Sequence, residues 1–181
     1  MIQFPIRCET SEGRLFVLRP WLPEDQDSLT LQANNPNIAR FMTDQFPHPF
    51  TAEKAAAFIE RAGQNTPPTI LAIDLNGMAV GGIGLHPGSD VYRNNAEMGY
   101  WLGEDFWGKG IITAAIKAMV QYGFSTLPVQ RIYARPYGNN PASQKALLKA
   151  GFTLEARLEK TILKNEEELD EWILAVRRHK R

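Results

Sequence analysis

The sequence predicts a single α+β domain built on a mostly antiparallel sheet, and three observations lead to this fold class. Apolar runs near the middle of the chain are joined by Asn76-Gly77, a strong hairpin signal. A strand over residues 96–102 leads through a glycine-rich turn into a helix that begins near Ile112. No repeat, low-complexity linker or shift in composition divides the 181 residues, so we expect one domain over 1–181.

The first third of the chain predicts one strand and two helices. Residues 14–20 read as a strand that its terminal proline ends. Residues 23–34 predict a helix, because Pro23 suits a first turn and two acidic residues follow it. Thr51 is expected to cap a second helix, which is rich in alanine and ends at Ala62. Helices are therefore expected to precede most of the sheet.

The segment between these helices, residues 41–50, is aromatic and interrupted by prolines, so we expect a loop. Two interpretations of its side chains are open. They either cap the core or line a substrate groove. The residues concerned are Phe41, Met42, Phe46 and Phe50.

The middle of the chain predicts a hairpin with an unusual second strand. Residues 69–75 and 78–85 are apolar and flank the Asn-Gly turn. Three glycines in the second strand, Gly81, Gly82 and Gly84, mark either a bulge or a close approach of backbones. No helix follows them, which argues against a phosphate loop at this position.

The last third predicts a strand, a capped helix and a closing hairpin. Residues 131–136 form a short strand. Asn140 is expected to cap the next helix, which Gly151 closes. Residues 152–158 alternate as a half-buried strand, and residues 172–176 alternate as the last strand after a turn.

The glycine-rich turn within residues 101–113 predicts an anion site. Gly108 and Gly110 lack a Cβ, so the backbone there can turn sharply and lie against a ligand. The first amides of a helix have no intrahelical acceptor and carry the positive end of the dipole, which suits phosphate. Residues 103–109 lack the P-loop pattern. A dinucleotide fingerprint would need a third glycine, where this chain has Thr113, and an acidic residue about 20 positions on. The strand at that distance, residues 131–135, contains no acidic residue.

Composition excludes several classes of function. Lys+Arg and Asp+Glu are both 20, and this balance argues against a general nucleic-acid binder. The basic tail over 177–181 is either a solvated end or a local recognition arm. Cys8 is the only cysteine, so no internal disulfide can form and a reducing compartment fits. The histidines lack metal-ligand spacing and no metal is expected; they are His48, His86 and His179.

No apolar run reaches the roughly 20 residues of a membrane span, and the N-terminus lacks the features of a signal peptide. We therefore expect a cytoplasmic protein without membrane or nucleic-acid partners.

Four motifs together resemble the GNAT acetyltransferases, in particular the branch of the ribosomal-protein N-terminal acetyltransferases RimJ and RimL. They are Ala96–Leu102, Phe106–Gly110, Asn140–Ser143 and Lys149–Phe152, and the resemblance covers about residues 12–177. It implies the acyl-CoA N-acyltransferase fold, with a mixed, mostly antiparallel sheet of about seven strands flanked by helices. In that fold the fourth and fifth predicted strands, 96–102 and 131–136, splay apart.

The resemblance implies acetyl-CoA as a co-substrate and no metal. The pyrophosphate would lie on the backbone of Trp107 to Ile112, and the pantetheine arm would enter the gap between the splayed strands. A free backbone N–H near Tyr100 or Trp101 would hold the thioester carbonyl. The residues expected to bind the co-substrate are Tyr100, Trp101, Leu102, Trp107, Gly108, Lys109, Gly110, Ile111, Ile112, Asn140 and Ser143.

One position departs from the family pattern. The family loop usually begins with Gln or Arg, where this chain has Asp105. A carboxylate there would weaken pyrophosphate binding, although binding relies mainly on backbone N–H groups. Lys109 either offsets that charge or is simply solvated.

The chemistry needs an amine that has lost its proton and a proton for the departing thiolate. Glu97 is the candidate base, directly or through water, and is otherwise a solvent-facing strand residue. Many family members protonate the thiolate with a Tyr at the position of Leu147; the RimJ/RimL branch instead offers Ser143, which could equally serve only the helix start. The spare acids are Tyr100, Tyr133 and Tyr137.

The sequence therefore predicts an N-acetyltransferase that moves acetyl from acetyl-CoA to a primary amine by direct attack in a ternary complex. The acceptor would be a small molecule or a protein N-terminus, and the protein a monomer or homodimer. An inactive acyl-CoA sensor or assembly module is the first alternative. A nucleotide-binding domain of another kind is the second.

Overall fold

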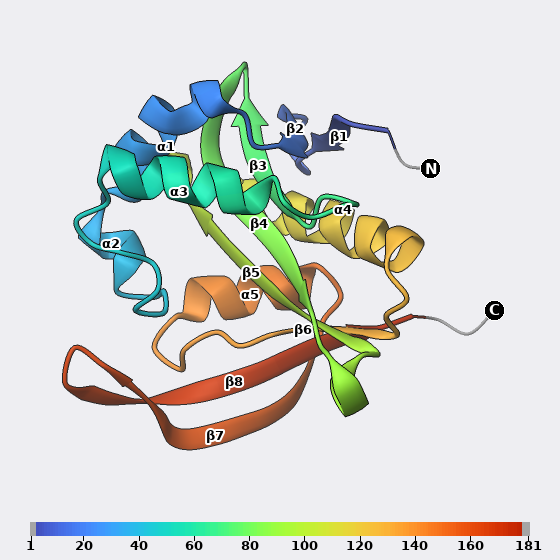
Figure 1. Cartoon of the computed structure of the whole chain (residues 1–181). Coiled ribbons are helices and arrows are strands. Elements are labelled where there is room, and N and C mark those ends of the chain that lie inside the picture. The colour runs from blue at the N-terminus through green and yellow to red at the C-terminus, as the bar shows by residue number, and fades with distance from the viewer. Residues whose placement is uncertain (1–2, 179–181) are drawn as a thin grey trace.

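A computed structural model describes residues 3–178 and shows one mixed sheet with helices on both faces (Figure 1). The spatial order of its eight strands is β1-β2-β3-β4-β5-β6-β8-β7. Within the described residues the strands are β1 (Ile6–Glu9), β2 (Leu15–Pro20), β3 (Ile70–Leu75), β4 (Met78–Pro87), β5 (Asn95–Leu102), β6 (Arg131–Ala134), β7 (Thr153–Lys164) and β8 (Glu167–Arg177). The α-helices are α1 (Gln26–Ala33), α2 (Pro36–Ala39), α3 (Ala52–Ala62), α4 (Ile111–Thr126) and α5 (Pro141–Lys149).

The sheet is antiparallel except between β5 and β6, which run parallel. This confirms the predicted α+β class with a mostly antiparallel sheet. The parallel pair requires a long crossover, and α4 supplies it. β5 and β6 are therefore the two strands that the glycine turn and α4 connect.

Two apolar clusters lie on opposite faces of the sheet. On one face, Ile116 of α4 and Leu147 of α5 are fully buried among the even-numbered residues of β5. On the other face, Leu29 of α1 and Ile59 of α3 pack with Trp101 of β5. Successive side chains of a strand point to opposite faces, so β5 contributes to both clusters. We call the side of α1 to α3 the acceptor face and the side of α4 and α5 the donor face.

The expectation of about seven strands was one short, because it did not include β1. This strand has only four residues and pairs with β2, with Cys8 opposite Phe16. So short a run carries too little alternation to be distinguished from a loop. The short helix α2 was also missed; Asn35 caps it by accepting a hydrogen bond from the Asn37 amide at 2.8 Å.

The glycines of β4 serve close packing, and a bulge lies beside them. A Cβ at Gly81 would lie 2.5 Å from the Trp101 carbonyl oxygen, and one at Gly82 would lie 2.8 Å from Trp101 Nε1. The β3–β4 register shifts between Ile73 and Asp74. Both interpretations of the glycine-rich strand are therefore confirmed, and they bring Trp101 close over β4.

The start of the basic tail is paired with other parts of the chain, although the Arg177 side chain is 67% exposed. Arg177 pairs with Glu155 at 3.0 Å. The Arg178 guanidinium donates to the carbonyl oxygens of Leu127 and Val129 at 3.0–3.2 Å, which anchors the end of β8 to the loop before β6. Residues 179–181, including His179, lie outside the described part of the chain.

Candidate active site

The glycine turn begins α4 with free amides. Gly108 and Gly110 have φ angles of 72° and 73°, which side-chain-bearing residues rarely adopt. Gly110 is the N-cap of α4, and no side chain caps that helix. The first amides of α4 are thus left for a ligand, as the anion-site prediction requires. A Cβ on Gly110 would meet Thr10 at 3.5 Å, so the β1–β2 turn supports this loop from behind.

The loop is fixed to the end of β5. The indole Nε1 of Trp107 donates to the carbonyl oxygen of Leu102 at 2.7 Å, although the Trp107 side chain is 41% exposed. Lys109 Nζ donates to the carbonyl oxygen of Asp105 at 2.6 Å and lies 5.6 Å from the centre of the Phe106 ring. The Lys109 ammonium is therefore held against the Asp105 backbone and is not simply solvated, whereas an offset of the Asp105 carboxylate charge stays a prediction.

The sheet opens between β5 and β6 within the described residues. They pair only over Asn95–Glu97, opposite Arg131–Tyr133, and β5 then continues to Leu102 along β4 alone. This confirms the predicted splay of these two strands.

The direction of the free amides follows from the β4–β5 ladder. At its two ends the amides of Gly88 and Gly103 each donate to the opposite strand at 2.8 Å. Alternate residues of an antiparallel strand face its partner, so the odd-numbered residues of β5 bond to β4. The Tyr100 amide therefore points into the open side, beyond the last β5–β6 pair at Glu97 and Tyr133, whereas the Trp101 amide faces β4. Of the two alternatives at this point, Tyr100 has the free amide.

On the donor face, Ser143 and Tyr100 meet. Ser143 is the third residue of α5, and its hydroxyl lies 2.6 Å from the Tyr100 hydroxyl. Its amide donates to Oδ1 of Asn140 at 3.2 Å, so the Asn140 side chain caps α5. Burial raises the pKa of Tyr100 well above its usual value, a rise that the hydrogen bond with Ser143 only partly opposes. Tyr100 consequently stays protonated at neutral pH.

Glu97 lies on the acceptor face, apart from Ser143. The Tyr133 hydroxyl donates to Glu97 Oε2 at 3.3 Å. Burial, followed by the charge of Glu97, raises the pKa of Tyr133, which keeps the hydroxyl protonated as a donor. His86 of β4 pairs in register with Glu97 on the other side. Glu97 is therefore flanked by a tyrosine and a histidine from the neighbouring strands.

Sequence reasoning did not identify His86, or an ion pair directly after the end of β6, as part of this face. Arg135 donates to both carboxylate oxygens of Glu171 at 2.7 and 3.1 Å, and Glu171 is only 4% exposed. The alternation of Arg131, Tyr133 and Arg135 with buried apolar residues was a readable signal. It places all three side chains on one face of the sheet.

The 41–50 loop and the β7–β8 hairpin meet at the edge of the acceptor face. Lys164 Nζ contacts Asp44 Oδ1 at 2.7 Å, with the lysine side chain 10% exposed and the aspartate 85%. Phe46 lies 5.8 Å from Trp101 between ring centres, whereas Phe50 is buried in the core. Phe46 and Met42 also pack against the cluster that contains Phe50, so the core-capping interpretation is confirmed for these residues, and a substrate groove stays a prediction. A cavity of about 300 Å³ lies here, and its lining includes Phe46 and Lys164.

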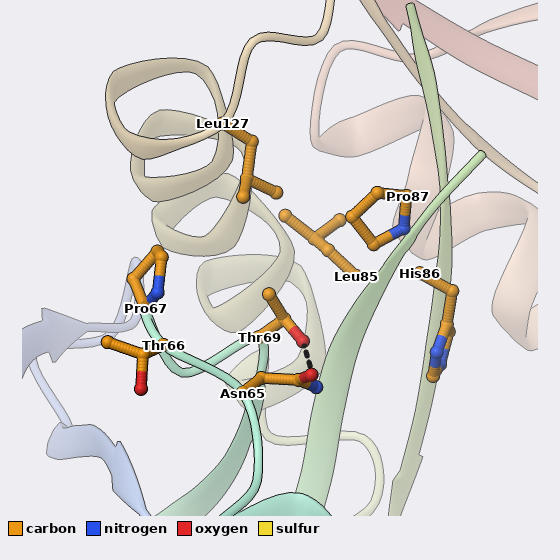
Figure 2. A pocket seen from close by; sticks show the side chains of 8 residues that line it. All are labelled: Asn65, Thr66, Pro67, Thr69, Leu85, His86, Pro87 and Leu127. Atoms are coloured by element: carbon orange, nitrogen blue, oxygen red, sulfur yellow. Dashed lines mark hydrogen bonds between the residues drawn. The ribbon is translucent and has the colours of Figure 1, made fainter. Parts of the chain in front are cut away.

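A second cavity, of about 380 Å³, lies beside β4 and the C-terminal end of α4 (Figure 2). Its polar contact is between Asn65 Nδ2 and Thr69 Oγ1, at 2.9 Å. Leu85 and Leu127 form its apolar side, while His86 points away from them. Apart from His86, none of its lining residues belongs to the site described above.

Within residues 3–178, no group of three or more His, Cys, Asp or Glu side chains is arranged to hold a metal ion. The helices of this part of the chain are all too short or too polar to cross a membrane.

Three curated relatives resemble this chain. YoaA, an uncharacterized N-acetyltransferase of Bacillus subtilis (strain 168), is 37% identical over 86 residues, 48% of either chain. The match thus spans about half the length of that relative. p20, an uncharacterized N-acetyltransferase of Bacillus licheniformis, is 29% identical over 83% of this chain and 85% of that protein. The ribosomal-protein-serine acetyltransferase of Escherichia coli (strain K12) is 34% identical over 41% of each.

Two solved structures have the same fold. The microcin C7 self immunity acetyltransferase MccE, in complex with acetyl-CoA and AMP, has a TM-score of 0.78 and 28% identity over 90% of this chain and 92% of that one. The ribosomal L7/L12 alpha-N-protein acetyltransferase RimL, in complex with coenzyme A, has a TM-score of 0.79 and 18% identity over 90% and 93%.

A sequence model of the acetyltransferase (GNAT) domain matches residues 15–153, more than half of the chain. This span includes β5, the glycine turn, α4 and α5, which carry the site. The chain therefore belongs to the acetyltransferase (GNAT) domain family.

Proposed function

We propose that the protein transfers an acetyl group from acetyl-CoA to a primary amine by direct attack in a ternary complex. The observation that carries the proposal is the open side of β5, where Tyr100 directs a free amide. That opening lies between the uncapped start of α4 and Glu97 on the acceptor face. A thioester in the opening would be within reach of both faces of the sheet.

The donor would bind mainly to backbone. Its pyrophosphate fits the amides of residues 108–112, which lead into the positive end of α4. The Trp107 amide is already used, because it donates to the Glu104 carbonyl oxygen at 3.1 Å. Its pantetheine arm fits the opening beside Met98 and Tyr100. The Tyr100 amide would donate to the thioester carbonyl and stabilise the negative charge that develops on that oxygen during attack.

The acceptor must lose a proton before it attacks. A free α-amino group has a pKa of about 8 and a lysine about 10.4, so both are largely protonated at neutral pH. Glu97 would accept that proton, directly or through water. The hydrogen bond from Tyr133 holds the carboxylate at the β5–β6 junction, where the sheet opens.

The departing thiolate needs a proton, and Ser143 is the candidate donor. It lies at the start of α5, where the helix dipole favours developing negative charge. Leu147 is buried and cannot serve. Cys8 is not a nucleophile in this scheme, because burial raises its pKa to about 11 and keeps it a thiol at neutral pH. Direct transfer therefore needs no covalent enzyme intermediate.

The class of acceptor is a primary amine, and a protein N-terminus is the first to test. The E. coli relative is by name a ribosomal-protein-serine acetyltransferase, which supports this order of testing. The MccE structure, which carries AMP beside acetyl-CoA, makes small-molecule amines the second class to test.

The decisive experiment mixes the protein with acetyl-CoA and a panel of amines, including peptides with free N-termini, and measures thiol release. Turnover with any amine supports the proposal. If acetyl-CoA binds tightly but no amine of the panel is acetylated, the result would support the alternative of an acyl-CoA sensor. Stronger thermal stabilisation by ATP or NAD than by CoA would indicate a nucleotide-binding domain.

A further inference from the structure

The acceptor face has an open space above Gly99, in the middle of β5. Gly99 is exposed, and Glu97 and Trp101 lie on either side of it on the same face. A Cβ built on Gly99 would meet, apart from its chain neighbours, only Nε2 of His86, at 4.0 Å. The missing side chain thus leaves a hollow beside the part of β5 that has no partner strand.

His86 leans over this hollow. Its Nε2 lies 3.5 Å from the position that a Cβ of Gly84 would take, and Gly84 is the cross-strand partner of Gly99. The imidazole therefore extends along the sheet from the His86–Glu97 pair toward the glycine pair. It points away from Leu85 and the cavity on the opposite side of β4 (Figure 2).

Desolvation, and not the surrounding charges, favours a neutral His86 ring, although part of the residue is exposed. Desolvation is the main cause that lowers the pKa of His86; Glu97 of β5 has the next largest effect and raises this pKa, and Arg61 of α3 lowers it. Tyr133 of β6 is the third neighbour, and its hydroxyl donates to the Glu97 carboxylate. A neutral imidazole nitrogen can accept a hydrogen bond from an ammonium N–H, whereas an imidazolium would repel it.

We propose that the hollow above Gly99 holds the ammonium group of the acceptor and that His86 accepts a hydrogen bond from it. This rests on the proposed function and adds the place and partner of the amine. The ammonium then gives one proton to the Glu97 carboxylate, and the nitrogen lone pair attacks the thioester carbon. As the C–S bond breaks, the nitrogen loses a second proton and the CoA thiolate gains one through Ser143, which leaves the acetylated amine and the CoA thiol.

The proposal can be tested without turnover. CoA-saturated protein labelled in its histidine rings is titrated with n-butylamine and with a tetrapeptide that has a free N-terminus, and the ring signals are followed by NMR. His86→Gln identifies the His86 signal. We expect a saturable shift of that signal with at least one of the two amines. No shift with either amine would overturn the proposal.

Gly99→Ala tests the hollow itself. Its backbone lies outside the left-handed region and the new methyl meets no backbone atom, so the variant should fold. We expect amine affinity to fall about tenfold, because the methyl fills the hollow, with acetyl-CoA affinity unchanged. Gly63→Ala, at the end of α3, is the matched control and should bind amine like the wild type. Equal amine affinity in Gly99→Ala would overturn the proposal.

The pH dependence separates binding by His86 from a packing role. In the wild type, the KM for the amine should rise as pH falls through the pKa of His86, and His86→Gln should lose this rise. The same rise in both proteins would overturn the role of His86. A normal NMR shift without acetyl transfer to any amine would instead remove the proposed function and leave the amine site standing.

Discussion

The two faces of β5 form their sites in different ways. The donor face is built mainly from backbone, with Ser143 as its candidate catalytic side chain. The backbone parts are the left-handed glycines of the turn, the uncapped start of α4 and the free amide of Tyr100. The acceptor face is built from side chains that come from β4, β6, β8 and the 41–50 loop. Acetyl-CoA is the same molecule in every enzyme that uses it, and backbone groups, which every sequence has, can bind it. Acceptors differ from one enzyme to another, and the side chains that bind them can differ as well. We therefore expect the acetyl-CoA site to be common to the family and the acceptor site to be specific to this sequence.

The largest expected effect is the loss of acetyl-CoA binding on the donor face. Gly110→Asp places a carboxylate at the N-cap of α4, where pyrophosphate would bind, and should lower acetyl-CoA affinity by more than about 10³-fold. Calorimetry measures the affinity and a melting curve measures folding. Gly77→Asp is the control, since Gly77 has a similar φ of 85° in the β3–β4 turn. Unchanged affinity in Gly110→Asp would reject this site.

Ser143→Ala tests the chemistry of the donor face. A lost general acid should lower turnover by about 10²-fold or more under saturating acetyl-CoA. A purely structural hydroxyl would cost about 1 kcal/mol through its bond to Tyr100 and leave turnover intact. Thr51→Ala, which removes the cap of α3, provides a stability control. A lower melting temperature with normal turnover would leave Ser143 a helix-start residue only.

Glu97→Gln tests the acceptor face. Turnover should fall by about 10²-fold at pH 7 and recover toward wild type above the pKa of the acceptor, where the amine is already neutral. Acetyl-CoA affinity should change little. Glu168→Gln, an exposed carboxylate of β8, is the matched control. The same loss at every pH would contradict the role of Glu97 as a base.

The smallest expected effect concerns the edge of the acceptor face. Asp44→Asn removes the charge that holds Lys164 of the hairpin. Because Asp44 is 85% exposed, stability should change by less than about 1 kcal/mol. The KM for the amine should change a few-fold while acetyl-CoA affinity does not. A change in acetyl-CoA affinity would show that the two faces are not independent.

The sequence alone determined the donor face well, because its signals are local. The glycines before α4, the Asn140 cap of α5 and the splay of β5 from β6 follow from short motifs or from the family that these motifs resemble. Each depends on backbone conformation over a few residues. The exceptions are β1, whose four residues carried too weak a pattern, and Arg178, which binds carbonyl groups some 50 residues away.

Only the tertiary structure decided the acceptor face. His86 stood in the sequence as one of three scattered histidines, and the β4–β5 register places it opposite Glu97. The Lys164–Asp44 contact joins residues 120 positions apart. The choice of Tyr100 over Trp101 as the residue with the free amide required the hydrogen-bond alternation of the ladder. Such placements depend on strand register and packing between distant segments, and no local pattern encodes them.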